Sequence, residues 1–167
     1  MRKQQKASAD PGLVIYLDEG GEKMSTYYLA IDIGASSGRH MLGSLENGKM
    51  NLEEVYRFSN GMKWVNGSLC WDVEALFYEI TEGLKRCKEI GKIPSFMGID
   101  TWAVDYVLLD GNNQILGKTY GYRDDRTTGM DEKVYEKISS EELYERTGIQ
   151  KQIFNTIYQL MAVKQKE

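Results

Sequence analysis

The sequence has few of the residue types that several classes of site and partner require. Only two cysteines, Cys70 and Cys87, and one histidine occur among 167 residues. The cysteines lack C-x-x-C spacing, which gives no support to a disulfide framework or a zinc site. No stretch approaches the roughly 20 apolar residues of a membrane span, and the N-terminus lacks the apolar run of a signal peptide. These absences predict a cytoplasmic protein that does not bind membranes.

Positive charge is also in short supply. Lys and Arg number 21 against 25 Asp and Glu, which gives a formal net charge of −4. Surfaces that bind nucleic acid or anionic lipid need clustered Lys and Arg. The charge balance therefore predicts small molecules or proteins as partners, and no nucleic acid.

The composition suits one folded domain preceded by a tail. Hydrophobic residues make up 41% of the chain and aromatic residues 11%, which is enough for a sizeable core. Residues 1–23 differ, because they are polar, mixed in charge and apolar only at 13–17. We interpret them as a disordered tail or a wrongly assigned start, since Gly20–Lys23 matches the translation of a purine-rich ribosome-binding sequence before Met24. The domain is then expected over residues 24–167.

Residues 30–42, which read AIDIGASSGRHML, hold the first candidate site. An apolar strand ends at Asp32, and a hard oxygen ligand of this kind suits Mg²⁺, bound through water. Gly34 and Gly38 allow a positive-φ or close-approach backbone, so that successive N–H groups converge on one anion. The planar guanidinium of Arg39 suits phosphate oxygens. The candidate phosphate-binding residues are Ala35, Ser36, Ser37, Gly38 and Arg39.

Three other interpretations of this loop are a P-loop, a Rossmann phosphate-binding loop and a plain hairpin. It matches neither G-x-x-x-x-G-K-[ST] nor G-x-G-x-x-G, and an alternating strand follows it where those motifs require a helix. A β-hairpin whose turn is rich in Gly and Ser explains the segment equally well. The segment alone does not decide between a phosphate cradle and a plain hairpin.

The pattern along the chain predicts a mixed α/β fold. Alternation of apolar and polar residues predicts strands over 27–34, 38–45 and 51–59, which form a three-stranded antiparallel meander. Asp72 is placed to cap a helix of about four turns. Further expected elements are strands over 69–71, 96–99, 104–109 and 114–116 and helices over 130–138, 139–148 and 155–166.

This order of elements is the opening of a ribonuclease-H-like or actin-like ATPase domain with flanking helices. In such a fold the strand over 96–99 lies parallel to the first strand, and it reads as buried. Asp32 and Asp100 then both stand at carboxyl ends of strands, where ligands gather in open α/β sheets. We expect the two carboxylates to face one cleft.

From about residue 28 onward the chain resembles the N-terminal domain of the FGGY family of carbohydrate kinases, most closely its rhamnulokinase subfamily. Several motifs in order are far more specific than any one of them. They are AIDIGASSGRHML, RFSNG at 57–61, WDVEAL at 71–76, GIDTWAVDYVLLD at 98–110, YRDDRT at 122–127, and ERTGIQ followed by FNTIYQL.

The resemblance implies a role for each candidate residue. Asp32 and the loop over 35–39 would face Mg²⁺ and the ATP phosphates. The substrate would be L-rhamnulose or a similar ketose, phosphorylated by ATP to the 1-phosphate. Its binding residues would be Thr101, Trp102, Ala103, Asp105, Tyr122, Arg123, Asp124 and Arg126.

The chemistry of those residues suits a sugar, because a ketose needs polar groups for its hydroxyls and a flat apolar face for its C–H surface. Each also has a plainer explanation: residues 123–126 as a solvated, salt-bridged turn, and Trp102 as core. The rhamnulokinase pattern has Gly where Ala103 stands. We expect the extra methyl to narrow the sugar pocket or shift its substrate preference. L-Fuculose, D-xylulose, D-ribulose and glycerol remain open as substrates.

One departure from the family concerns length. The resemblance places the general base and the adenosine-binding elements in a later part of a chain about three times as long, so no catalytic residue is assigned here. We therefore expect a half-site that binds without turnover, with a separately encoded C-terminal half as a possible partner. The alternatives are a non-catalytic sugar-binding fragment and a two-metal nuclease that uses Asp32 and Asp100.

Overall fold

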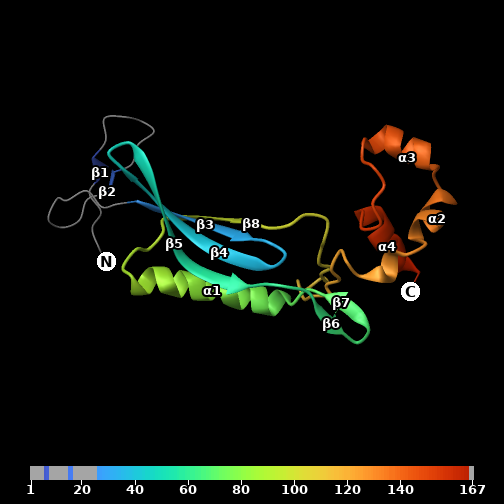
Figure 1. The fold of residues 1–167 in the computed structure, drawn as a ribbon, viewed down its shortest axis with the longest axis horizontal. Helices are drawn as coiled ribbons and strands as arrows, with labels where there is room; N and C mark the ends of the chain where they lie inside the picture. The colour runs from blue at the N-terminus through green and yellow to red at the C-terminus, as the bar shows by residue number, and fades with distance from the viewer. Residues whose placement is uncertain (1–5, 8–14, 17–25, 166–167) are drawn as a thin grey trace. The chain divides into compact units, whose positions relative to one another are not determined.

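The computed structural model describes residues 6–7, 15–16 and 26–165, which form two compact units (Figure 1). The first unit includes strands β3, β4, β5 and β8, and the second includes the β6–β7 hairpin and helices α2 to α4. Lys6–Ala7 (β1) pairs antiparallel with Ile15–Tyr16 (β2). The rest of residues 1–25 lies outside the described residues, so the expected tail and start remain predictions.

The sheet of the first unit has the order β5-β4-β3-β8. Its strands are β3 (Tyr27–Ile33), β4 (Ser37–Glu46), β5 (Lys49–Ser59) and β8 (Phe96–Asp100). The turn between β4 and β5 is Asn47–Gly48, with φ of 50° and 76°, the type I′ geometry that matches the twist of antiparallel strands. β8 pairs parallel with β3. The predicted meander and mixed sheet are confirmed.

The core of the first unit lies between this sheet and residues 80–89 of α1 (Val73–Glu89), which run along one face of it (Figure 1). Alternate residues of β3 are buried, namely Leu29, Ile31 and Ile33, as the period-2 pattern predicts. His40 of β4 is fully buried, and its Nε2 atom lies 3.3 Å from the Ile80 carbonyl oxygen of α1. The single histidine is therefore a packing residue.

The expectation that the strand over 96–99 is buried is wrong. Every residue of β8 is exposed, including Phe96 at 62% and Ile99 at 47%. β8 occupies the edge of the sheet, and among the described residues only β3 pairs with it. A strand that is apolar on both faces is typical of the centre of a parallel sheet. β8 has such a sequence but lies at the edge of the sheet.

The second unit begins with a hairpin of β6 (Lys63–Val65) and β7 (Ser68–Cys70), joined through Asn66–Gly67, both with positive φ. The sequence predicted the second strand and missed the first. A short 3₁₀ helix, Asp125–Thr127, and three α-helices follow. The helices are α2 (Met130–Tyr135), α3 (Ser140–Thr147) and α4 (Thr156–Lys164).

Capping residues define the ends of α3 as the sequence predicted. The Ser139 hydroxyl accepts a hydrogen bond from the N–H of Glu142, and Gly148 ends the helix with φ of 65°. Within the part of the chain that is described, no helix is both long and apolar enough to cross a membrane.

The predicted strand over 104–109 does not form. Only an isolated bridge, Leu109 to Ile115, remains of the expected pairing with residues 114–116. Val104 has φ of +72°, which breaks an extended strand at its first residue. The turn between the two segments is present, since the Asp110 carboxylate accepts from the N–H groups of Asn112 and Gln114, each at 2.8 Å.

Close packing of α1 on β4 generates a prediction. A Cβ atom at Gly83 would lie 2.2 Å from the His40 ring, so Gly83→Ala should lower the free energy of unfolding by about 1–3 kcal/mol, although Ala is the better helix former. Gly98→Ala is the control, because a Cβ there meets nothing within 4 Å. Thermal melts followed by circular dichroism measure both; a higher melting temperature for Gly83→Ala would contradict the packing.

Candidate functional site

The loop between β3 and β4 is a tight turn held from a second segment of the chain. The N–H of Gly34 donates to the Ser37 carbonyl at 2.8 Å. Asn60 makes two hydrogen bonds to the turn. Its backbone N–H donates to the Ser36 carbonyl at 3.0 Å, and its Nδ2 atom donates to the Gly34 carbonyl at 2.8 Å. The loop is therefore fixed in shape, and the N–H of Gly34 is used within it. No role was predicted for Asn60 from the sequence.

The glycines of the loop serve close approach. Neither Gly34 nor Gly38 has a positive φ. A Cβ at Gly38 would lie 2.1 Å from the Phe58 ring, and one at Gly34 would lie 3.3 Å from the Ser37 carbonyl oxygen. Positive φ is therefore wrong for both glycines. Their close contacts are with protein atoms, and the convergence of N–H groups on an anion stays a prediction.

Asp32 and Arg39 form an ion pair across this loop. Nε and Nη2 of Arg39 both donate to Oδ2 of Asp32, at 2.9 and 2.7 Å. Both side chains are about half exposed, at 50% and 48%, so solvent weakens the pair and both groups are accessible to a ligand. The residue expected to bind the cation and the residue expected to bind the anion thus neutralise each other.

Asp100 lies beside Asp32 on the neighbouring strand, since the parallel register of β3 and β8 pairs these two residues. Both are exposed at the carboxyl ends of their strands, as the sequence predicted. No group of three or more His, Cys, Asp or Glu suited to a metal ion occurs among the described residues. Mg²⁺ commonly binds one or two carboxylates and completes its shell with phosphate oxygens and water, so the donor set here fits a nucleotide-bound Mg²⁺.

The carboxylate of Asp105 joins several predicted sugar-site residues. Its Oδ2 atom accepts hydrogen bonds from the indole N–H of Trp71 at 2.5 Å, the indole N–H of Trp102 at 3.1 Å and the backbone N–H of Tyr122 at 3.1 Å. The two indole rings lie 3.9 Å apart between centroids. Asp105 therefore holds aromatic side chains from separate segments. No role was predicted for Trp71.

The remaining predicted sugar-site residues differ in their exposure to solvent. Thr101, Ala103 and Arg123 are exposed, while Trp102 and Tyr122 are half-buried. The Arg123 guanidinium lies 5.2 Å from the centre of the Tyr122 ring, close enough for a cation–π contact. This cluster offers a charged donor, a hydroxyl and aromatic faces to a ligand.

Asp124 and Arg126 are buried, with side chains 3% and 6% exposed. The Asp124 carboxylate accepts from the N–H of Leu69 at 2.6 Å and of Arg126 at 3.1 Å. The Arg126 guanidinium lies 4.1 Å from the centre of the Tyr120 ring and donates to Gln159. The alternative of a solvated turn is wrong for these two residues, and their contacts with substrate remain a prediction.

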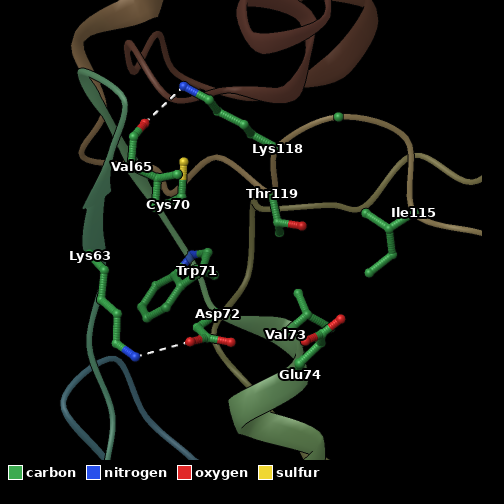
Figure 2. A pocket seen from close by; sticks show the side chains of 11 residues that line it. Lys63, Val65, Cys70, Trp71, Asp72, Val73, Glu74, Ile115, Lys118 and Thr119 are labelled. Atoms are coloured by element: carbon green, nitrogen blue, oxygen red, sulfur yellow. Dashed lines mark hydrogen bonds and ion pairs between the residues drawn. The ribbon is translucent and has the colours of Figure 1, made fainter.

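A pocket of about 270 Å³ lies between the β6–β7 hairpin and residues 115–119 (Figure 2). Figure 2 shows Lys63 reaching the Asp72 carboxylate and Lys118 reaching the Val65 carbonyl, at 2.9 and 2.8 Å. Trp71, a partner of Asp105, lines this pocket. The sequence predicted no pocket at this position.

Asp72 is the N-cap of α1, as predicted. Its Oδ1 atom accepts from the N–H of Ala75 at 2.9 Å. This hydrogen bond, together with that from Lys63, holds the pKa of Asp72 below its ordinary value of 3.8. A capping carboxylate at the N-terminus of a helix is stabilised by the helix dipole.

The chain is similar to carbohydrate kinases of known sequence and structure. Residues 27–167 match the model of the FGGY family of carbohydrate kinases, N-terminal domain. Rhamnulokinase from Halalkalibacterium halodurans is 55% identical over 140 residues, which is 84% of this chain and 30% of that protein. The chain thus spans about 30% of the length of this curated relative.

Two solved structures share the fold. Gluconate kinase from Lactobacillus acidophilus superposes with a TM-score of 0.68 at 15% identity, over 86% of this chain and 29% of its own. Plasmodium falciparum glycerol kinase with ADP superposes with a TM-score of 0.67 at 14% identity, over the same shares of the two chains. The mixed sheet, with carboxylates at the ends of two parallel strands, thus has the actin-like α/β fold. The chain belongs to the FGGY family of carbohydrate kinases, as its motifs predicted.

The capping role of Asp72 generates a prediction. Asp72→Ala should lower the free energy of unfolding at pH 7 by about 1 kcal/mol. Because the folded pKa lies below 3.8, the charged cap contributes fully above that value and is lost as the pH falls through the folded pKa. Urea unfolding from pH 7 to pH 3 should show the difference from wild type shrinking only below about pH 4.

Glu145→Ala, at an exposed carboxylate of α3, is the control and should change stability little at any pH. A difference between Asp72→Ala and wild type that stays constant down to pH 3 would contradict the assigned cap.

Proposed function

We propose that this chain provides the phosphate- and sugar-binding N-terminal part of a kinase that transfers a phosphoryl group from ATP to L-rhamnulose or a related ketose. The product would be the sugar 1-phosphate. The observation that carries the proposal is the 55% identity over 140 residues to a rhamnulokinase. The fold is shared by kinases that act on several substrates, so the choice of ketose depends on sequence identity alone.

The phosphate side of the proposal depends on the Asp32–Arg39 ion pair. When a Mg²⁺-bound nucleotide arrives, Asp32 would exchange the guanidinium for the cation, through water, and Arg39 would exchange the carboxylate for phosphate oxygens. Each charge then keeps an opposite partner throughout, which limits the desolvation cost of binding. Hydroxyls and N–H groups of the turn over 35–38, fixed by Asn60, would supply the remaining donors.

The sugar side depends on the cluster around Asp105. Trp102 and Tyr122 would provide apolar walls for the C–H face of the ketose, with Thr101 and Arg123 as polar contacts for its hydroxyls. Asp105 would accept from the sugar through Oδ1, because Oδ2 already accepts three protein donors. The Ala103 methyl is exposed beside these groups and would narrow the site. Asp124 and Arg126, whose side chains are buried, would support the residues that line the sugar site.

Turnover needs a group that removes the proton from the sugar hydroxyl, and no described residue is assigned to it. Phosphoryl transfer also depends on in-line positioning of both substrates. We propose that the 167-residue polypeptide binds both ligands without completing catalysis, and that a further polypeptide segment, in the same chain or separately encoded, supplies the base. A cytoplasmic location remains a prediction.

The strand-end carboxylates favour one second candidate. Asp32 and Asp100 in register resemble the ligands of a two-metal nuclease. The net charge of −4 disfavours it. Degradation of RNA or DNA by the purified protein with Mg²⁺ would support the nuclease and overturn the kinase.

The kinase proposal predicts that the two ligands bind at separable sites. Isothermal titration of the wild-type protein should detect L-rhamnulose alone and Mg·ATP alone. Arg39→Gln should weaken Mg·ATP about tenfold, because it removes charge-assisted hydrogen bonds to phosphate, and leave L-rhamnulose binding unchanged.

Arg86→Gln is the matched control, since Arg86 is an exposed arginine of α1 paired with Glu89 at 3.1 Å. It should alter neither affinity. Absence of L-rhamnulose binding by the wild-type protein would overturn the sugar assignment, and equal loss of Mg·ATP binding in both variants would overturn the role of Arg39.

A further inference from the structure

Gln159 of α4 is a buried glutamine that is not one of the predicted site residues. Its side chain is almost fully enclosed, with the residue 2% exposed. Its Nε2 atom donates to the carbonyl oxygens of Val104 at 3.0 Å and Phe154 at 2.9 Å, and its Oε1 atom accepts from Nη2 of Arg126 at 2.5 Å. Carbonyl oxygens only accept and a guanidinium only donates, so these partners fix the orientation of the amide.

The most unusual of these partners is Val104. It has φ of +72°, a left-handed conformation that is costly for a β-branched side chain and persists only where the surroundings enforce it. The Gln159 amide holds the carbonyl of this residue directly. A second contact strengthens the link, since Nε2 of Gln159 lies 3.4 Å from Oδ1 of Asp105.

The strained residue stands inside the proposed sugar site. Ala103 precedes Val104 and Asp105 follows it. The direction in which Asp105 leaves the backbone therefore depends on the Val104 conformation, and Asp105 in turn holds the indole N–H groups of Trp71 and Trp102. A change at Val104 would move the carboxylate and both aromatic walls.

Arg126 extends the same network. Its Nη1 atom donates to the backbone carbonyl of Gln159 at 3.2 Å while Nη2 binds the side chain. One residue of α4 thus receives the buried guanidinium and holds the strained turn over 103–105. Filling space alone would need neither the two donors nor the acceptor of an amide.

We propose that Gln159 is a positioning residue for sugar binding, which acts by clamping the Val104 carbonyl so that Asp105 and Trp102 keep the orientation that receives the ketose. This inference rests on the proposed function. Gln159 makes no contact with the ligand. Its effect should fall on the sugar and leave the nucleotide unaffected, because Asp32 and Arg39 share no hydrogen bond with this network.

The test uses Gln159→Met, which keeps the side-chain volume and burial and removes every hydrogen bond of the amide. Isothermal titration should show the dissociation constant of L-rhamnulose raised about tenfold and that of Mg·ATP changed less than about twofold. Gln165→Met is the matched control, because Gln165 is an exposed glutamine near the end of the same helix, and it should change neither constant.

A second variant tests the mechanism. Glycine adopts φ near +72° without strain, so Val104→Gly should recover part of the lost L-rhamnulose affinity when added to Gln159→Met. General damage to α4 would not be repaired by a substitution in a different segment. If Gln159→Met does not fold, Gln159→Asn keeps a polar amide one methylene shorter and should show the same selective loss, at about threefold or more.

The outcomes separate the two proposals. Absence of L-rhamnulose binding by the wild-type protein overturns the proposed function and this inference together. Wild-type binding with unchanged sugar affinity in the folded Gln159 variants overturns only the role of Gln159. Equal weakening of sugar and nucleotide, or no recovery with Val104→Gly, shows a structural effect alone and also overturns it.

Discussion

Parallel pairing of β3 with β8 is the constraint on which the proposed phosphate site depends. It brings Asp32 and Asp100, which are distant in sequence, to adjacent positions at one end of the sheet. A slip of one residue would turn one of the two carboxylates to the opposite face, because side chains alternate along a strand. The buried residues Leu29, Ile31 and Ile33 set the register of β3, so the packing of the core also determines which carboxylates are neighbours.

The second unit relies on buried polar groups where the first relies on alternating apolar residues. Asp105, Asp124 and Gln159 each bind two or more segments through side-chain hydrogen bonds. Residues 101–124 contain no regular strand, so their backbone cannot be fixed by a ladder of hydrogen bonds. Carboxylate and amide side chains fix this backbone instead. For this reason, several residues expected at the sugar site also have structural partners.

Much of the fold could be predicted from sequence, because the signals were local. Alternation gave the strands of the meander, Asp72 and Ser139 gave helix starts, and Gly148 gave a helix end. The misses depended on tertiary context. Phe96 reads as buried because composition does not reveal which strand lies at an edge, and Val104 reads as a strand residue because its left-handed φ is imposed by distant partners such as Gln159. The same limit hid Trp71 and Asn60, whose motifs were recognised without their contacts.

The ion pair between Asp32 and Arg39 explains how a site of opposite charges can remain folded and ready for its ligand. An exposed pair contributes little stability, so breaking it costs little when a ligand supplies better partners. A nucleotide with its metal carries both charges needed to replace it, whereas a lone anion or a lone cation replaces only one and leaves the other side chain unpaired. In the proposed site, Arg39 and Asp32 would therefore favour the complex of metal and phosphate over either component.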